Sequence, residues 1–280
     1  MKRRKTLQIT VLFSKVRTSF FWVSLFTLAV VAMSSPRTCV ATTVVYDTTP
    51  YWATFPGVIG GWGPGQSSTI GETFVAPVGA STTLNDFSFF AESYYPYLDG
   101  VASLHLRAFV YAWSPIISGP GARATGSPLY LSPSFVFTPP PRPEGWVPLT
   151  ANFGGDGLTL NPGQRYVMGF TLSDPADYAA SQGDIEFEMM VVHGIYYPTP
   201  PIPVGVNIGS GSLAWLNNSN NFAALNTTDW TVADSWEQAD ALSFTAHFTV
   251  VPEPSAVALA LLGAAFGMKR CVGAKRRQRQ

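Results

Sequence analysis

The residue pattern with the most chemical potential is a run of alternating acidic residues, Asp184, Glu186 and Glu188. On a β-strand, residues two apart share one face, so the three carboxylates would lie together opposite an apolar face. Retaining glycosidases need two carboxylates about 5 Å apart, a separation that such neighbours can supply. The same carboxylates could bind Ca²⁺ together with the loop oxygens of Asp174 and Asp177. The simplest explanation of the pattern is a solvent-exposed acidic face, because it requires no special geometry of the three carboxylates.

Nothing in the sequence distinguishes a catalytic acid from a catalytic base among these carboxylates. A retaining mechanism needs one carboxyl group held protonated and another held ionised. The order Asp-x-Glu-x-Glu is superficially similar to the Glu-x-Asp-x-Glu strand of jelly-roll β-glucanases. However, it places aspartate at the nucleophile position and lacks the tryptophan-rich context that precedes that strand. We therefore expect no polysaccharide hydrolysis.

A second pattern is aromatic, because Phe109, Tyr111 and Trp113 occupy alternate positions of one strand-like segment. Exposed rings on one strand face could stack on the sugar rings of a polysaccharide. The alternative is that both faces of the strand are buried and the rings fill the core, which is the commoner position of aromatic residues. Further aromatic residues lie in glycine- and proline-rich segments: Trp52, Trp62, Tyr94, Tyr95, Tyr97, Tyr196 and Tyr197.

Other signals of catalysis or metal binding are sparse. His105, His193 and His247 occur singly in strand-like segments, and none has a partner at the spacing of a zinc site. The sequence contains no nucleophile elbow, P-loop or dinucleotide fingerprint. We expect no catalytic residue, and no metal or cofactor apart from the calcium alternative.

Short alternating segments between turn signals predict an all-β fold, an antiparallel β-sandwich of jelly-roll type. The clearest alternation runs from Leu242 to Val250, where apolar residues on one face alternate with Ser243, Thr245, His247 and Thr249 on the other. Such alternation predicts one buried and one solvated face. The expected strands are residues 69–75, 83–90, 104–111, 134–137, 164–171, 184–192 and 241–250.

Charge divides the chain into three unlike regions. Seven basic residues lie at or before Arg37 and six lie at or after Lys269, whereas all 17 acidic residues lie between Asp47 and Glu253. The central region has four arginines and no lysine, so its net charge is −13. This acidity argues against a nucleic-acid partner, since binding to nucleic acid requires the neutralisation of phosphates.

Residues 1–41 have the layout of a secretory signal peptide, with six basic residues among the first 18 before an apolar run at 20–33. We expect cleavage after Ala41 rather than nearer Ser34, and the alternative to cleavage is an uncleaved N-terminal membrane helix. The two cysteines, Cys39 and Cys271, lie in the terminal segments. The domain at 42–250 is therefore expected to fold as a soluble monomer without a disulfide.

The C-terminal segment, 251–280, has three parts in a fixed order. A motif at 251–255 precedes an apolar run at 256–268 and a basic tail at 269–280. Prolines keep the motif extended, and thirteen helical residues span only about 20 Å, short of a hydrocarbon core of about 30 Å. The segment is therefore expected to be a marginal hydrophobic helix with its basic end in the cytoplasm. The motif residues are Val251, Pro252, Glu253 and Pro254, and the basic stop includes Lys269, Arg270, Lys275, Arg276 and Arg277.

This C-terminal arrangement resembles the PEP-CTERM sorting signal of exported proteins of Gram-negative bacteria. The resemblance implies that a membrane-embedded exosortase recognises the motif, cuts near it and passes the protein to the cell surface, commonly in bacteria that make exopolysaccharide. Runs such as 71–74, 84–89 and 160–163 also resemble the sandwich cargo domains that accompany this signal and have no established enzymatic role. The alternative is an ordinary C-terminal membrane anchor after a proline-containing linker.

Three functional classes remain open. The expected one is a non-catalytic cell-surface or matrix protein that is exported, anchored transiently in the inner membrane and processed by exosortase. The second is a module that binds exopolysaccharide through its aromatic residues. The third is a glycoside hydrolase that uses the acidic strand. Exposure of Tyr111 and Trp113 would distinguish the second class from the first.

Overall fold

The computed structural model describes most of the central region of the chain. The described residues are 40–51, 56–64, 66–93, 103–116, 118–138, 146–181, 187–192, 211–233 and 241–253. For residues 51, 56–61, 92–93 and 187–192 only the backbone is described. Residues Ala41–Pro252 form one compact unit, to which all the described strands belong.

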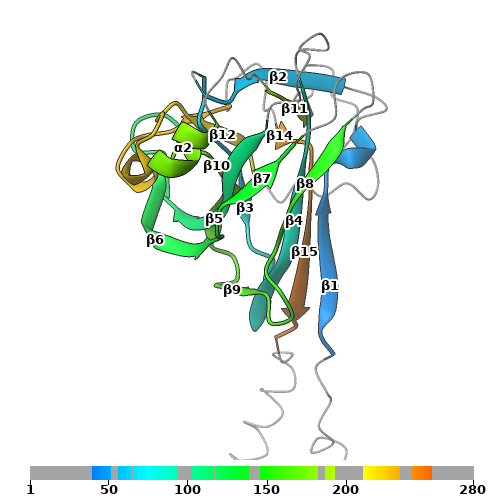
Figure 1. The fold of residues 1–280 in the computed structure, drawn as a ribbon. Coiled ribbons are helices and arrows are strands. Elements are labelled where there is room, and N and C mark those ends of the chain that lie inside the picture. The colour runs from blue at the N-terminus through cyan, green and yellow to red at the C-terminus, as the bar shows by residue number, and fades with distance from the viewer. Residues whose placement is uncertain are drawn as a thin grey trace, which may run out of the picture. The chain divides into compact units, whose positions relative to one another are not determined.

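Two antiparallel sheets make up this unit, and the first contains the strand that follows the N-terminal segment and the last strand of the domain (Figure 1). Its order is β1-β15-β4-β11-β14, with β2 paired to β11 and with β8 and β9 paired to β4. The strands of the first sheet are β1 (Thr42–Asp47), β2 (Pro56–Trp62), β4 (Ser81–Ser93), β8 (Val147–Asn152), β9 (Leu158–Leu160), β11 (Phe187–Val192), β14 (Ala241–Leu242) and β15 (Phe244–Val251).

The second sheet has the order β13-β12-β3-β10-β5-β6, with β7 paired to β5. Its strands are β3 (Thr69–Val75), β5 (Leu104–Trp113), β6 (Ala124–Leu131), β7 (Phe135–Phe137), β10 (Arg165–Thr171), β12 (Leu213–Leu216) and β13 (Thr231–Val232). Short helices occur in the connections at η1 (Thr49–Tyr51), α2 (Pro175–Ala180) and η2 (Phe222–Asn226). The all-β sandwich expected from the alternating segments is therefore confirmed.

The main core lies between the two sheets and is rich in phenylalanine. Phe87 of β4 contacts Phe170 of β10 with ring centroids 5.2 Å apart, and Phe248 of β15 contacts Phe74 of β3 at 5.7 Å. All four rings are fully buried. Burying such a side chain stabilises a fold by about 1.5–3 kcal/mol. The core therefore joins the sheets by apolar packing, without a disulfide among the described residues.

Most of the expected strands are present, and 69–75 coincides with β3. The expected strand at 184–192 begins only at Phe187 among the described residues. The strands not expected from the sequence are β1, β2, β6, β8, β9, β12 and β13. β6 was missed because Gly126 has a φ of 71° and the strand also contains Pro128, features that weaken a strand signal and are tolerated at a sheet edge.

The expected final strand is interrupted at Ser243, which separates β14 from β15. Ser243 was expected on the solvated face, but it is fully buried. Buried polar groups satisfy the backbone at this break: the Thr48 hydroxyl accepts a hydrogen bond from the Phe244 amide at 2.7 Å, and Glu72 accepts one from the Leu242 amide at 2.9 Å. After the break the expected alternation holds, because Phe244, Ala246, Phe248 and Val250 are buried.

Candidate functional site

The first candidate site is the end of the first sheet at which the chain enters and leaves the domain. We call it the terminal end and define it by residues 42–44, 79–81 and 249–251. β1 and β15 are antiparallel neighbours, and Thr42 lies opposite Val250. The Thr42 hydroxyl donates a hydrogen bond to the Val250 carbonyl at 3.4 Å. Figure 1 shows the start of β1 beside the arrowhead of β15. The expected leader and sorting motif are thus joined to adjacent points of one sheet.

A loop before β4 fixes the other side of β15. The Ala80 amide donates a hydrogen bond to the Val251 carbonyl at 2.7 Å, and Val251 lies opposite Ser81 in the β4–β15 register. A Cβ atom on Gly79 would lie 2.6 Å from a Val250 methyl group and 2.7 Å from the Val251 carbonyl oxygen, so this close approach requires glycine. The end of β15 is therefore held on both edges.

β1 is also attached to the opposite sheet. The Tyr46 hydroxyl donates a hydrogen bond to the Val75 carbonyl of β3 at 2.7 Å, and its ring lies 4.8 Å from that of Phe248. Burial raises the pKa of Tyr46 to about 12. Because Tyr46 connects the edge strand both to β15 and to β3, the strand that follows the expected leader is an integral part of the sandwich.

The expected sorting motif begins inside the fold. Val251 is the last residue of β15, one residue beyond the expected domain boundary at 250, whereas Pro252 and Glu253 are exposed. Proline lacks the amide hydrogen that a sheet ladder requires, so the strand ends there. Pro254, the apolar run at 256–268 and the basic stop lie outside the described residues. Within the described part of the chain, no helix is long and apolar enough to cross a membrane.

The aromatic row of β5 is buried. Phe109 has no exposed surface, and the exposed fractions of Tyr111 and Trp113 are only 2% and 6%. Burial raises the pKa of the Tyr111 phenol. Their rings therefore form a second core on the outer face of the second sheet and provide no open platform for sugar stacking. This position matches the alternative in which both faces of the strand are buried.

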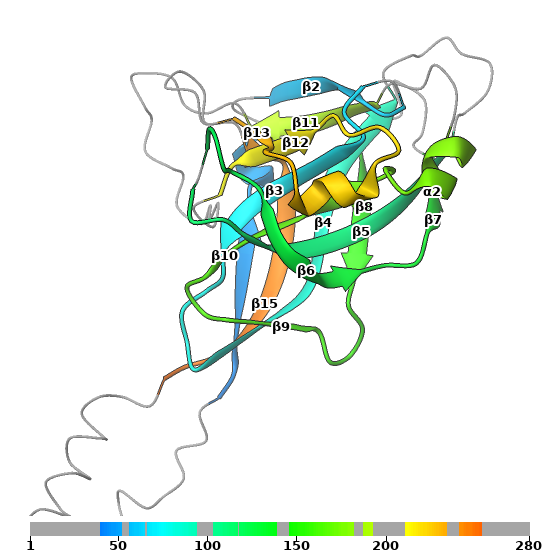
Figure 2. The same ribbon diagram turned by 90° about the vertical axis from the view of Figure 1, so that its left-hand side faces the viewer.

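A later segment of the chain covers these rings. Trp230 contacts Trp113 edge-on with ring centroids 5.5 Å apart and Phe109 at 6.0 Å. The Trp230 amide bonds to the Ala122 carbonyl at 2.7 Å, and its indole N–H bonds to the Leu225 carbonyl at 2.9 Å. Figure 2 shows the η2 segment passing in front of the strands of this sheet. The sequence did not indicate this partner, because Trp230 lies far from β5 along the chain.

The predicted acidic cluster is described only in part. Asp184 and Glu186 lie outside the described residues, and for Glu188 only the backbone in β11 is described. The register places Glu92 of β4 opposite Glu188. Sequence reasoning missed Glu92 because the pairing joins strands that are distant along the chain. The loop aromatic residues Trp52, Tyr94, Tyr95, Tyr97, Tyr196 and Tyr197 also lie outside the described residues, whereas Trp62 is buried.

The two neighbouring aspartates that were considered for calcium have an arginine partner. The Arg107 guanidinium lies 2.7 Å from Asp177 and 3.5 Å from Asp174. Asp174 also caps α2 by accepting a hydrogen bond from the Ala176 amide, which is a typical N-cap role. These carboxylates thereby attach α2 to β5. The described residues contain no group of three or more side chains suited to holding a metal ion.

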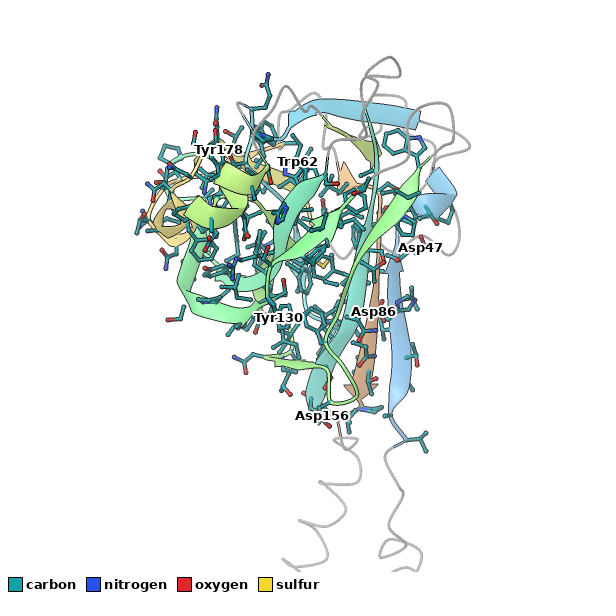
Figure 3. All side chains as sticks on the ribbon, viewed as in Figure 1. Asp47, Trp62, Asp86, Tyr130, Asp156 and Tyr178 are labelled. Carbon is teal, nitrogen blue, oxygen red and sulfur yellow. The ribbon has the colours of Figure 1, made fainter. Side chains whose placement is uncertain are left out.

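The outer face of the first sheet is polar. Near its centre, Nδ1 of His247 lies 2.6 Å from Oδ1 of Asp86, and both side chains are partly exposed. Figure 3 places Asp86 on β4 next to β15. Ser88 and Thr150 exchange a hydrogen bond at 2.7 Å on the same face. Two rows of polar residues cross the strands on this face. The first row consists of Thr43, Thr249, Thr83 and Thr159. The second row consists of Asp47, Thr245, Ser88 and Thr150.

Glu72 is the most unusual ionisable group of the described core. It is fully buried between the sheets, and burial raises its pKa well above the ordinary value, although the hydrogen bond from the Leu242 amide opposes the shift. Oε2 accepts that bond, whereas no described residue forms a hydrogen bond to Oε1. The Glu72 carboxyl group links β3 to the break before β15.

No protein-family model, no curated protein and no solved structure matches this chain.

Proposed function

We propose that this protein is an exported cell-surface or extracellular-matrix protein that is sorted by an exosortase and has no catalytic role. The observation that carries the proposal is the position of the Val-Pro-Glu-Pro motif, which starts at the last residue of the domain's final strand and precedes an apolar run and a basic tail. A leader with the layout of a signal peptide precedes the first strand.

The properties of the domain support this proposal. Residues 42–253 have a net charge of −13 and no cysteine, which suits a protein that is secreted and does not depend on the redox state of its surroundings. We take the cargo to be monomeric, with exosortase as its processing partner and the inner membrane as its transient anchor. The jelly-roll subtype is part of the proposal, and it is supported by successive strands β3, β4 and β5, which alternate between the two sheets.

Mass spectrometry of the protein from cells and medium tests the proposal. We expect a mature form that lacks both ends, and we expect Glu253→Ala to accumulate as a membrane-bound precursor. Asp156→Ala, which removes an exposed carboxylate elsewhere on the domain, is the matched control and should be sorted normally. Recovery of the intact chain from Met1 to Gln280 at the cell surface, or normal sorting of Glu253→Ala, would overturn the proposal.

Exopolysaccharide binding is the second candidate function. The polar outer face of the first sheet supports it, since rows of hydroxyl and carboxylate groups can form hydrogen bonds with sugar hydroxyls. The test is co-sedimentation of the purified 42–252 domain with bacterial exopolysaccharide. Binding through this face should be weakened by Asp86→Ala and retained by Leu129→Ala, which changes an exposed residue of β6 in the other sheet. Equal binding by both variants would exclude this face as the polysaccharide-binding surface.

Polysaccharide hydrolysis is the function that we propose this domain lacks. Incubation with a panel of β-glucans and exopolysaccharides, followed by a reducing-end assay, should show no turnover. Turnover that Glu188→Gln abolishes would overturn the non-catalytic assignment. Turnover that survives this substitution would direct attention to other carboxylates, Glu92 first, because it lies opposite Glu188 in the register.

A further inference from the structure

The turn that joins β8 to β9 contains an aspartate directly followed by a glycine, Asp156–Gly157. Figure 3 shows Asp156 near the terminal end of the first sheet. Its side chain is exposed, and no described residue forms a hydrogen bond or an ion pair with it. The other described aspartates each have a polar partner, and none of them precedes a glycine: Asp47, Asp86, Asp174, Asp177 and Asp229.

The backbone of this turn leaves the Gly157 amide accessible to the Asp156 carboxyl group. The turn is closed by a hydrogen bond from the Gly157 amide to the Gly154 carbonyl at 3.3 Å, which is long for such a bond. Gly157 has no side chain to shield its nitrogen, and Gly154 and Gly155 precede the aspartate. Exposed turns with few packing contacts open locally at little cost in free energy. The amide nitrogen of Gly157 can therefore approach Cγ of Asp156.

We propose that Asp156 is a site of spontaneous isomerisation, at which the folded domain changes from an aspartyl to an isoaspartyl linkage. The Gly157 amide nitrogen attacks Cγ of Asp156, and an N–Cγ bond forms. One carboxyl oxygen leaves as water, with the amide proton and a proton from solvent.

The succinimide ring that results is opened by water. Water adds to the main-chain carbonyl carbon of Asp156 and breaks its bond to nitrogen, so the chain continues through Cγ. The new α-carboxylate returns one proton to the solvent. Water is released once and taken up once, so the composition of the protein is unchanged, and no oxidant or reductant takes part. This inference goes beyond the proposed sorting function and does not depend on it.

Isomerisation should loosen β9, because Gly157 fits closely against β4. Gly157 has a φ of 61°, and a Cβ atom on it would collide with a methyl group of Thr83 and lie 3.0 Å from the Leu84 carbonyl oxygen. An isoaspartyl linkage lengthens the main chain by one methylene group immediately before this glycine. Leu158, which pairs with Leu84, would then be displaced. We therefore expect faster amide hydrogen exchange throughout β9.

Peptide mapping of the aged full chain tests the site. Asp156 is the only aspartate between Arg123 and Arg165, so trypsin separates it from Asp99–Gly100, which lies outside the described residues. The purified protein is incubated at neutral pH, folded and, in parallel, unfolded in urea. Isoaspartate is detected by labelling with isoaspartyl methyltransferase and by a changed retention time at unchanged peptide mass.

We expect the folded protein to accumulate the label in the Asp156 peptide. Asp156→Glu should lose it, because glutamate keeps the charge but would have to close a six-membered ring. Asp229→Glu, which changes an aspartate held by Arg123, is the matched control and should keep the label in the Asp156 peptide.

Label in the unfolded but not in the folded protein would overturn the inference, because it would mean that the turn holds the two reacting groups apart. Equal labelling of the Asp156→Glu peptide would also overturn it. Hydrogen exchange of the separated isoaspartyl form measures the effect on β9. Unchanged exchange of the amides of Leu158 to Leu160 would contradict the expected loosening of that strand.

Discussion

The outer faces of the two sheets differ in what covers them. On the first sheet, β15 directs Thr245, His247 and Thr249 outward, and all three are partly exposed. On the second sheet, β5 directs Phe109, Tyr111 and Trp113 outward, and all three are buried under the segment around η2. Both strands alternate with a period of two, yet one outer face contacts solvent and the other is the base of a second core.

The difference shows that alternation in the sequence distinguishes the two faces of a strand. It does not determine whether the outer face is exposed to solvent or buried. Where the outer residues are hydroxyl-bearing or ionisable, exposure to water satisfies them. Where they are aromatic, exposure would leave a large apolar surface in water, so another segment covers it. Asn218 shows how this cover is attached: its side chain accepts a hydrogen bond from Thr69 of β3 and donates one to the Asn221 carbonyl.

Removal of Trp230 is the strongest test of this comparison. Trp230→Ala should lower the free energy of unfolding by about 3–5 kcal/mol, because it leaves a cavity above Phe109 and Trp113. Urea unfolding followed by circular dichroism measures the change. Leu129→Ala, a truncation of an exposed residue of β6, is the control and should change the free energy by less than about 0.5 kcal/mol. If both variants lost similarly small amounts of unfolding free energy, Trp230 and the segment around η2 would not form a second core with β5.

The second prediction concerns Glu72, which is buried in the core between the two sheets. Its pKa in the folded state is raised above its value of about 4.3 in the unfolded state. Between these two pKa values the folded state therefore holds one proton more than the unfolded state. The contribution of Glu72 to the free energy of unfolding is fully present at pH values below its pKa in the unfolded state. It decreases by about 1.4 kcal/mol per pH unit as the pH rises toward its pKa in the folded state.

The measurement is a series of urea unfolding curves at pH values upward from about 4. Glu72→Gln should remove this contribution to the pH slope, because the amide keeps an acceptor for the Leu242 N–H and does not titrate. Asp156→Asn removes an exposed carboxylate instead and should retain the slope. An unchanged slope in Glu72→Gln would mean that Glu72 does not hold an extra proton in the folded domain.

The Asp86–His247 pair should show the smallest effect, because it lies on the solvated face. Both side chains are partly exposed, so Asp86→Ala should cost less than about 1 kcal/mol of stability. The loss should shrink at about 1 M salt, where the Debye length falls to about 3 Å. Urea unfolding at low and high salt measures both values. A loss of several kcal/mol would show that this face is coupled to the core as tightly as the aromatic face.

The fold class could be predicted because alternation is a local property of the sequence. The strand at Thr69–Val75 and the buried residues of β15 followed directly from that period. β6 escaped prediction because it contains Gly126 and Pro128 at a sheet edge. The break at Ser243 could not be foreseen either, because Glu72 and Thr48, which satisfy the backbone there, belong to distant strands.

The sequence alone determined the alternating strands, the distribution of charge and the order of the terminal segments, because each of these is written in neighbouring residues. The tertiary structure decided that the aromatic row of β5 is core, that Glu92 lies opposite Glu188, and that Thr42 lies beside Val250. Each of these depends on pairing or packing between segments distant along the chain. Burial and register arise only when such segments meet, so no local pattern could have specified them.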